Sequence, residues 1–297
     1  MSVKTVQAII NGQTYNLTLN SQTGKYEATV TAPAKSSYGQ SGHYYGVTVT
    51  ATDDANNTTI KDATDSTLGE SLRLVVKEKV VPIVTITYPT AGAFLSNANP
   101  EIAFKVTDDD SGVKADSIAL TVDGKAVAAA DIVKKAVTGG YECTYTPETG
   151  LANGEHTISV TAQDNDGNAA AAKTVTFVVD TVPPTLNVTS PADGLVTNTA
   201  SLTVSGTTDD ATSKPVTVTV NGDAVSVNAD GSWSKTIELE SGSNTITIVA
   251  RDKAGKTTTV TRTVTLDTGD PVIHSVTLTP NPVDAGKTFI ISVEVTD

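Results

Sequence analysis

The residues best suited to acid–base or nucleophilic chemistry are three histidines and one cysteine, namely His43, His156, His274 and Cys143. His43 and His156 occupy corresponding positions in two repeats of the chain, where a third repeat has Asn244. A histidine that Asn replaces in a sister repeat is best explained by a structural role. No Ser-His-Asp set, glycine-rich phosphate loop or zinc-ligand spacing accompanies these residues. The sequence therefore predicts no catalytic residue and no enzymatic activity.

Cys143 alternates with Tyr141 and Tyr145, so a strand would place the three side chains on one inward face. No base is placed near the thiol, and a free cysteine packs like a small apolar residue. We predict a buried core thiol. A single cysteine also excludes an intrachain disulfide.

Acidic residues gather in loops and at the joints between repeats, where they are candidates for a calcium site. Calcium takes six to eight oxygen ligands, and carboxylates at a joint could stiffen it by sharing one ion. No complete calcium-loop signature is present, so solvated acidic loops are the alternative, and no other cofactor is expected. The candidate ligands are Asp108, Asp110, Asp164, Asp166, Asp180 and Asp267.

The charge of the chain is strongly negative, with a formal net charge of -13 and a pI near 4.6. An acidic surface repels phosphate backbones, so we expect no nucleic-acid partner. No apolar run is long enough for membrane insertion. Residues 1–10 lack an apolar signal region. If Met1 is the native start, we expect synthesis in a cytoplasm without general secretory export; a start introduced by cloning would remove that inference.

Three hairpin signals recur along the chain, each preceded by residues that alternate between apolar and polar. Such dipeptides adopt the positive φ of tight two-residue hairpins, and a period of two predicts strands with one buried face. The signals are Asn11-Gly12, Asp123-Gly124 and Asn221-Gly222. The alternating apolar residues before them are Val6, Ala8 and Ile10, then Ile118, Leu120 and Val122, then Val216, Val218 and Val220.

Further blocks repeat after each hairpin. Tyr26, Tyr141 and Trp233 each follow a glycine, and we interpret them as core anchors, with sugar stacking as the alternative. In each unit a later strand ends at an aspartate that opens a turn. Asp suits such turns because its side chain bonds to nearby backbone amides. These blocks are Val47-Val49-Ala51-Asp53, Ile158-Val160-Ala162-Asp164 and Ile246-Ile248-Ala250-Asp252, and the predicted final strands are 71–76, 174–179 and 259–266.

The joints between repeats also follow a pattern, because an acidic residue stands four positions before a proline that opens a strand. The pairs are Glu78 and Pro82, Asp180 and Pro184, and Asp267 and Pro271. The joints are short and carry no Gly-Ser tract, which predicts a semi-rigid rod of modules. The expected domains are 1–80, 81–181, 182–268 and a half-domain at 269–297.

The two ends of the chain do not match the repeat. Residues 1–80 lack the two strands that precede the hairpin in the second and third units. Residues 272–278 and 289–295 match those two strands, and Val295-Thr296-Asp297 matches Val106-Thr107-Asp108. The ends are thus complementary parts of one β-sandwich.

An incomplete sandwich exposes core residues and strand edges that recruit another strand. We expect the tail of one chain to complete the first domain of another, which gives a homo-oligomer or filament by a heterologous contact. Closure within one chain and truncation of a longer repeat protein are the alternatives. The predicted assembly interface comprises Val6, Ala8, Ile10, Ile273, Val276, Leu278, Phe289, Ile291, Val293 and Val295.

The sequence resembles tandem bacterial immunoglobulin-like domains. The resemblance rests on the joints Val179-Asp180-Thr181-Val182-Pro183-Pro184 and Leu266-Asp267-Thr268-Gly269-Asp270-Pro271, and on the turn from Ala162 to Asn168. It implies an all-β fold of tandem immunoglobulin-like β-sandwiches. The joint after Val76 departs from the pattern, and no Cys–Trp–Cys framework of antibody type exists.

The resemblance implies two settings for such domains. They form stalks of bacterial surface adhesins, and they decorate bacteriophage capsids and tails, where they bind host-surface glycans. The opening residues 1–6 and the block 36–45 look like immunoglobulin-like proteins of phages of gut bacteria. We therefore expect a structural or adhesive virion protein that contacts other virion proteins, assembled in a host cytoplasm. The alternative is a stalk segment at a bacterial cell surface.

Overall fold

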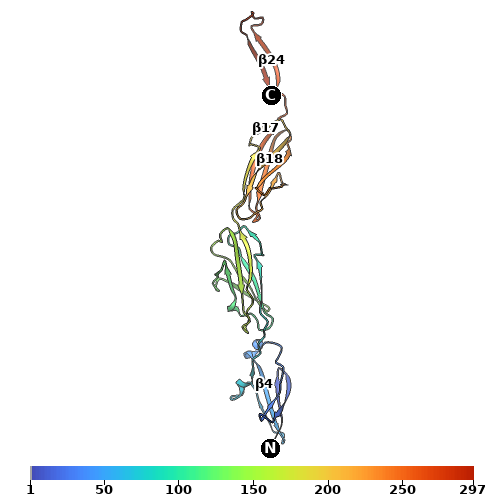
Figure 1. The fold of residues 1–297 in the computed structure, drawn as a ribbon, viewed down its shortest axis with the longest axis vertical. Coiled ribbons are helices and arrows are strands. Elements are labelled where there is room, and N and C mark those ends of the chain that lie inside the picture. The colour runs from blue at the N-terminus through green and yellow to red at the C-terminus, as the bar shows by residue number, and fades with distance from the viewer. Residues whose placement is uncertain (1) are drawn as a thin grey trace. The chain divides into compact units, whose positions relative to one another are not determined.

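The computed structural model describes residues 2–297 and is built almost entirely of β-strands, as predicted (Figure 1). Its contacts divide the chain into two units, one of residues 1–93 and 97–179, the other of residues 94–96 and 180–297. No helix within residues 2–297 is long and apolar enough to cross a membrane.

Residues 2–80 form one sheet with the strand order β3-β2-β1-β4-β5, and β6 also pairs with β4. The β1–β2 hairpin turns at Asn11 and Gly12, whose φ values of 48° and 73° fit the predicted two-residue turn. The elements are β1 (Val3–Ile10), β2 (Gln13–Asn20), β3 (Lys25–Glu27), η1 (Ser37–Gly39), η2 (Ser41–His43), β4 (Tyr45–Asp53), β5 (Thr58–Lys61), η3 (Gly69–Leu72) and β6 (Arg73–Leu74).

The strand predicted at 71–76 is wrong for most of its length. Residues 71 and 72 belong to η3, and only the two residues of β6 are extended and paired. The strand that follows β4 is instead β5, which pairs along it from Val49 to Thr52. Alternation of apolar residues at 72, 74 and 76 is too short a pattern to separate a strand from a 3₁₀ turn.

The strands of residues 83–179 form a two-layered β-sandwich, which we call the second sandwich. One layer runs β12-β13-β9-β7 and the other contains β11-β10-β14-β15. Phe104, Ile158 and Phe177 are fully buried between them. The elements are β7 (Ile83–Tyr88), β8 (Phe94–Leu95), β9 (Ile102–Thr107), η4 (Ala115–Ser117), β10 (Ala119–Val122), β11 (Lys125–Ala126), β12 (Val133–Val137), β13 (Gly140–Tyr145), β14 (Gly154–Thr161) and β15 (Lys173–Val179).

The strands of residues 185–266 form the third sandwich, with layers β16-β18-β21 and β17-β23-β22-β19-β20. Trp233 packs in its core with Val204, Val218 and Ile248. Strand β17 pairs parallel to β23, a pairing that sequence alternation did not predict. The elements are β16 (Thr185–Ser190), β17 (Leu195–Thr197), β18 (Ser201–Asp209), β19 (Thr217–Val220), β20 (Asp223–Val225), β21 (Ser232–Glu238), β22 (Gly242–Arg251) and β23 (Thr257–Leu266).

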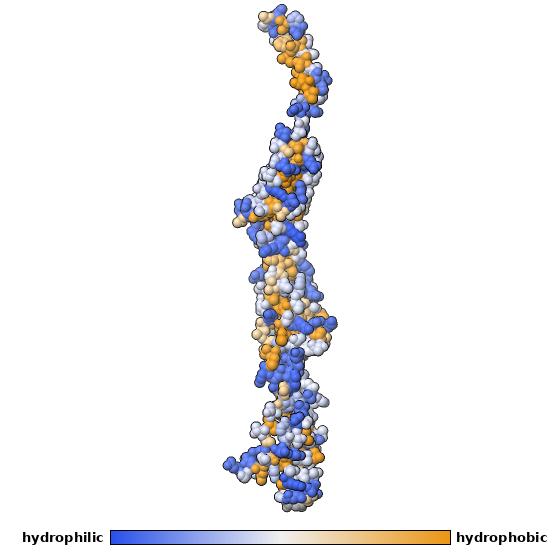
Figure 2. Space-filling model, turned by 90° about the vertical axis from the view of Figure 1, so that its right-hand side faces the viewer, coloured by the Kyte–Doolittle hydropathy of each residue, from blue (hydrophilic) through white to orange (hydrophobic). Residues whose placement is uncertain are grey.

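Residues 272–296 form an antiparallel hairpin of β24 (Val272–Thr279) and β25 (Ile290–Thr296), which we call the C-terminal hairpin. It is a two-stranded sheet by itself. Hydrophobic surface runs along this hairpin, at the top of the view in Figure 2. A lone two-stranded hairpin is marginally stable in water at best, so this element needs a partner surface.

Candidate functional site

The first sheet has an apolar face that is only partly covered within residues 2–80, where Tyr26 of β3 reaches Val3 of β1. Val6 and Ile10 of β1 are only partly buried, and Ala8 retains 9% of its exposed area. The corresponding residues of β19 in the third sandwich are almost completely buried, with Val218 at 1% and Val220 at 0%. The same sequence pattern therefore produces a closed core in the third sandwich and an open one here.

The C-terminal hairpin carries the opposite half of such a core. Its apolar face is built from three cross-strand pairs, Ile273 with Val295, Val276 with Val293, and Leu278 with Ile291. Each of these side chains is between 42% and 64% exposed, and Phe289 beside them is 46% exposed. The other face is mostly polar, for example where Thr277 lies opposite Ser292. The hairpin is thus amphipathic, with nothing packed on its apolar side.

The C-terminal hairpin repeats the register of β7 and β9 over its first two pairs. Val272 pairs with Thr296 as Ile83 pairs with Thr107, and the next pair repeats likewise. Beyond these pairs the bulge follows Ile273 in β24 but Ile86 in β7, so the pairing differs by one residue while the positions of β25 still correspond to those of β9. Val295, Val293 and Ile291 stand where β9 has Val106, Phe104 and Ile102, all at most 1% exposed. Because alternation along a strand decides which side chains face a core, β25 presents the same inward positions as β9 of the second sandwich.

Strand β3 has an open edge where that register could continue. In the second sandwich, β13 pairs with β12 on one side and with β9 on the other. The β2–β3 hairpin corresponds to β12–β13, and β3 pairs with β2 alone. Tyr26 of β3 matches Tyr141, which lies opposite Val106. The place that β9 fills in the second sandwich is therefore vacant beside β3 among the described residues.

Buried carboxylates gather at two equivalent places. In the third sandwich, Asp180, Asp210 and Asp252 each offer an oxygen, and these oxygens lie within 4.8 Å of one another. The three residues are 1%, 6% and 6% exposed. Two unit charges 4 Å apart repel by about 4 kcal/mol at an effective dielectric constant near 20, so such a group needs donors or a cation.

The matching group in the second sandwich is Glu78, Asp108 and Asp164, again within 4.8 Å. Asp164 accepts from Asn168 twice, through the backbone amide at 2.7 Å and the side-chain amide at 2.6 Å. Glu78 accepts from the amide of Ser111 at 2.7 Å. Both groups combine a joint carboxylate, a loop carboxylate and a turn-opening aspartate, so they are one feature repeated.

Of the six predicted calcium ligands, the structure brings Asp108 and Asp164 together in one carboxylate group, places Asp180 in the other group, and places the remaining three in neither. Asp110 accepts from the amide of Ser36, and Asp166 accepts from the amide of Glu78. Asp267 is exposed and accepts from Gly269. Superposing the repeats would have added the missed members, because Glu78, Asp210 and Asp252 occupy the positions of Asp180, Asp108 and Asp164.

The structural role predicted for His156 is supported by its partners. Its ring lies 2.7 Å from Asp123 and 2.7 Å from the carbonyl oxygen of Ala152. Asn244 bonds the carbonyl of Glu240, also four residues earlier, at 2.7 Å. Burial raises the pKa of Asp123, but hydrogen bonds from the Thr157 amide and His156 outweigh it and leave the pKa lowered. These contacts connect the start of β14 to the β10–β11 turn and to the loop before β14.

His43 and His274 make local contacts. His43 stacks on Tyr38 with ring centroids 4.2 Å apart, and His274 lies 2.6 Å from the Thr296 hydroxyl across the C-terminal hairpin. Cys143 is 1% exposed, which confirms the predicted core thiol, and burial raises its pKa to about 11. Of the predicted aromatic anchors, Trp233 is fully buried, whereas Tyr26 and Tyr141 are partly buried.

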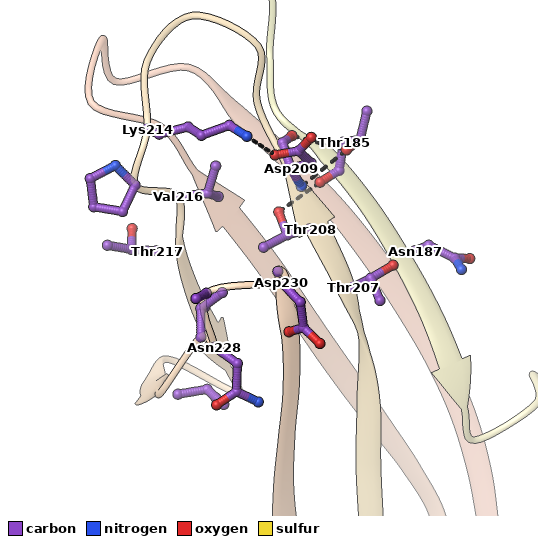
Figure 3. A pocket seen from close by; sticks show the side chains of 15 residues that line it. Thr185, Asn187, Thr207, Thr208, Asp209, Lys214, Val216, Thr217, Asn228 and Asp230 are labelled. Carbon is purple, nitrogen blue, oxygen red and sulfur yellow. Dashed lines mark hydrogen bonds and ion pairs between the residues drawn. The ribbon is translucent and has the colours of Figure 1, made fainter.

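A polar pocket of about 740 Å³ opens on the third sandwich, between β16, β18 and the segment before β19 (Figure 3). Lys214 reaches across it to Asp209 at 2.7 Å, and this contact lowers the pKa of the Asp209 carboxyl. Its lining is formed by threonine, asparagine, aspartate and small apolar residues, without an aromatic ring. The pocket offers hydrogen bonds to a polar ligand but no stacking surface for a sugar.

Comparisons with known proteins match two parts of the chain to bacterial families. Residues 82–160 match the family described as "Bacterial Ig domain", and residues 184–268 match "Glucodextranase, domain B". The chain contains tandem immunoglobulin-like domains. The two immunoglobulin-like regions correspond to the second and third sandwiches. Both place their carboxylate group at the same point of the fold.

The relatives are large proteins of which the chain spans a small part. Bacillopeptidase F of Bacillus subtilis (strain 168) is 38% identical over 123 residues, which is 41% of this chain and 8% of that protein. The PII-type proteinase of Lactococcus lactis subsp. cremoris is 25% identical over 265 residues, or 83% and 13%. Chitinase ChiA of Flavobacterium johnsoniae (strain UW101) is 27% identical over 204 residues, or 63% and 12%.

Among solved structures, the fibronectin(III)-like modules of Clostridium thermocellum CbhA share 19% identity, with a TM-score of 0.40, over 62% of this chain and 94% of theirs. The segments that match this chain in sequence are parts of larger proteins, among them proteinases and a chitinase. The matches concern these domains, and none of them describes a reaction that this chain performs.

Proposed function

We propose that the chain is a non-catalytic structural protein whose copies join end to end, the C-terminal hairpin of one copy completing the first sheet of the next. The observation that carries this proposal is the match of the apolar positions of β25 to the buried positions of β9. In the joined state β25 would pair with the free edge of β3, with Val295 opposite Tyr26. The apolar face of the hairpin would cover β1 and β4. The occupant to which the proposal commits is a second copy of this chain.

The energetics favour a contact that depends on both packing and pairing. Six aliphatic side chains that are now about half exposed would contribute about 4 to 9 kcal/mol on full burial, at roughly 1.5–3 kcal/mol per side chain. Association itself costs about 4–15 kcal/mol. Burial of these six side chains therefore does not exceed the upper part of that cost, so burial of the receiving face and the ladder hydrogen bonds along β3 must contribute to the outcome. An unmatched strand would bind poorly because it would lose that ladder.

The test measures molar mass in solution by light scattering or sedimentation for full-length variants. Val293→Asp places a charge on the apolar face, and Ser292→Asp places it on the polar face of the same strand as a matched control. We expect the parent chain and Ser292→Asp to form oligomers that grow with concentration, and Val293→Asp to be monomeric.

A pairing experiment makes the test sharper. Val49→Asp would disable the receiving face, since Val49 pairs with Ala8 in the first sheet. A mixture of Val49→Asp and Val293→Asp chains retains one intact donor and one intact acceptor, so it should form a capped heterodimer. A monomeric parent chain whose hairpin resists proteolysis would indicate closure within one copy. A monomeric chain whose hairpin is cleaved readily would rule the joining out.

The setting of this assembly is part of the proposal. The resemblance of residues 1–6 and 36–45 to phage proteins supports a virion protein, in which host-surface glycans are candidate ligands of the polar pocket. The matches to parts of bacterial proteinases and a chitinase support a stalk segment at a bacterial surface equally well. Binding of labelled chains to phage-sensitive host cells, compared with immunolabelling of virions and of producing cells, separates the two.

A further inference from the structure

We infer that Asp180, Asp210 and Asp252 form a binding site for a divalent cation, with calcium as the ion that fits the donors. The inference is independent of end-to-end joining, because all three residues belong to the third sandwich and its leading segment. The ion would bind as a structural ligand and would take part in no reaction.

The fold brings the three carboxylates together from distant parts of the sequence. Asp180 precedes β16, Asp210 follows β18, and Asp252 follows β22. Oδ1 of Asp180 accepts from the amide of Val182, and Oδ2 accepts from the hydroxyl of Ser213, which is itself completely buried. The position of Asp180 is therefore fixed by bonds that hold its charge out of water.

The second observation is an unpartnered oxygen inside the cluster. Oδ1 of Asp252 accepts from the amide of Lys256 at 2.8 Å, while Oδ2 is buried and has no hydrogen-bond donor. Asp252 is only 6% exposed. A buried carboxylate oxygen without a donor is costly, and native structures rarely leave one unexplained. A cation placed among the three carboxylates supplies the missing partner.

Neutralisation by a basic side chain is not available here. None of the ion pairs in residues 2–297 involves Asp180, Asp210 or Asp252. Asp210 Oδ1 accepts only the amides of Thr212 and Ser213 and the Ser213 hydroxyl. Three buried carboxylates thus share polar donors without an opposite charge, which is the arrangement that a bound cation balances.

The chemistry of the donors selects the class of ion. All three ligand residues supply carboxylate oxygens, and hard cations such as calcium and magnesium prefer oxygen ligands, whereas zinc favours His and Cys. Two oxygens bound to one calcium ion at about 2.3–2.6 Å can be at most about 5 Å apart. The oxygens here lie within 4.8 Å of one another. Magnesium demands a tighter octahedral cage, so calcium is favoured.

The second sandwich offers an internal comparison. There Asn168 occupies the position of Lys256 and donates to Asp164 Oδ2, so that oxygen is already satisfied. The free oxygen is specific to the third sandwich. We therefore expect tighter calcium binding at Asp180, Asp210 and Asp252 than at the equivalent group of the second sandwich.

The single tryptophan makes the test specific to this site. Trp233 is the only tryptophan of the chain and lies in the core of the third sandwich. Its fluorescence during thermal unfolding of the full-length chain therefore follows this sandwich. At a calcium concentration a hundredfold above the dissociation constant, we expect the midpoint to rise by about 10 °C or more relative to chelator-treated protein. Magnesium at the same concentration should give a smaller shift.

Asp252→Asn and Asp210→Asn should each abolish most of the calcium-induced shift. Two controls should retain it: Asp164→Asn, in the equivalent group of the second sandwich, and Asp230→Asn, at an exposed turn of the third sandwich. Calorimetric titration with calcium chloride should show the loss of one bound ion in Asp252→Asn. Absence of any calcium-dependent shift in the parent chain, or an equal shift in Asp252→Asn and Asp230→Asn, would overturn the inference. Native circular dichroism of each variant verifies that it folds.

Discussion

Lys256 donates its backbone amide to Oδ1 of Asp252 at 2.8 Å and leaves the second oxygen of that carboxylate without a donor. In the preceding repeat the residue four positions after the turn-opening aspartate is an asparagine, which bonds both oxygens. The residue type at this position thus decides whether both oxygens of the buried carboxylate have donors within the protein, a closed arrangement, or one oxygen remains available to a ligand.

Lys256→Asn should convert the third sandwich to the closed arrangement. The new side-chain amide would bond Asp252 Oδ2, and a hydrogen bond to a charged group contributes about 1.5–3 kcal/mol. We expect higher stability without calcium and a smaller calcium-induced shift, both followed by Trp233 fluorescence in urea. Lys256→Gln is the control, since its longer amide is not set to reach that oxygen. Equal behaviour of the two variants would contradict this account.

Asp297 extends the two proposals to the joint between copies. It follows Thr296 as Asp108 follows Thr107, and Asp53 opens its turn as Asp164 does, with Asn57 bonding both of its oxygens. In a joined pair, Asp267 and Asp297 of one copy would approach Asp53 of the next. Because Asn57 closes Asp53 as Asn168 closes Asp164, we expect calcium to change oligomerisation little, and to the same extent in the parent chain and in Asp297→Asn. Sedimentation with calcium or chelator measures this, and Asp284→Asn, between the hairpin strands, is the control.

His156→Asn should be tolerated better than His156→Ala. The asparagine can bond the carbonyl of Ala152 as Asn244 bonds Glu240, whereas alanine removes the partner of that carbonyl and of Asp123 Oδ2. We expect His156→Ala to lower the free energy of unfolding by about 1–3 kcal/mol and His156→Asn to lower it by less. Urea unfolding monitored by circular dichroism compares them. A larger loss for His156→Asn would contradict the structural role.

Cys143 should react with thiol reagents only when its sandwich opens. Its folded pKa is raised from an ordinary value of 9.0 to about 11 because burial disfavours the thiolate. The associated stability is present below pH 9 and is lost as pH rises through the folded pKa near 11. At pH 8, labelling by a chromogenic disulfide should be slow in native protein and fast in concentrated urea. The chain has no other thiol, so rapid native labelling would contradict burial of Cys143.

At acidic pH, the contribution of Asp65 to the free energy of unfolding changes with pH in the opposite direction to that of Cys143. The pKa of Asp65 is lowered to about 2, chiefly by the hydrogen bond from Lys61. Its folded contribution is therefore present above the ordinary value near 4 and is lost as pH falls toward 2. Because Lys61 is exposed and Asp65 is only partly buried, salt should weaken this contribution, which urea unfolding at low and high ionic strength measures.

Much of the fold could be predicted because its signals are local. The dipeptides at Asn11, Asp123 and Asn221 demand positive φ, and all three residues have it, between 48° and 51°. Alternation before each turn then identifies the buried face. Strand β17 was not predicted, because a three-residue parallel pairing depends on a distant strand rather than on alternation within its own sequence. The prediction of a strand at 71–76 was wrong because the weak local pattern is equally compatible with the turn that precedes β6.

The carboxylate groups were only half predicted, for a different reason. Each group draws one residue from a joint, one from a loop and one from a turn, so no single stretch of sequence contains its signature. Asp110 and Asp166 look like ligands in the sequence, but in the structure they accept hydrogen bonds from the backbone amides of Ser36 and Glu78. Only the alignment of repeats relates Asp252 to Asp164, and only the structure reveals that its outer oxygen has no donor.

The polar face of the C-terminal hairpin governs what happens to the outside of a joined chain. Ser275 donates to Glu294 across this face at 3.2 Å, so a negative charge is held at its centre. Copies carrying this charge on an acidic protein would repel one another flank to flank. Elongation would therefore produce single filaments without lateral association into bundles. Protein concentration or a capping variant would set the filament length.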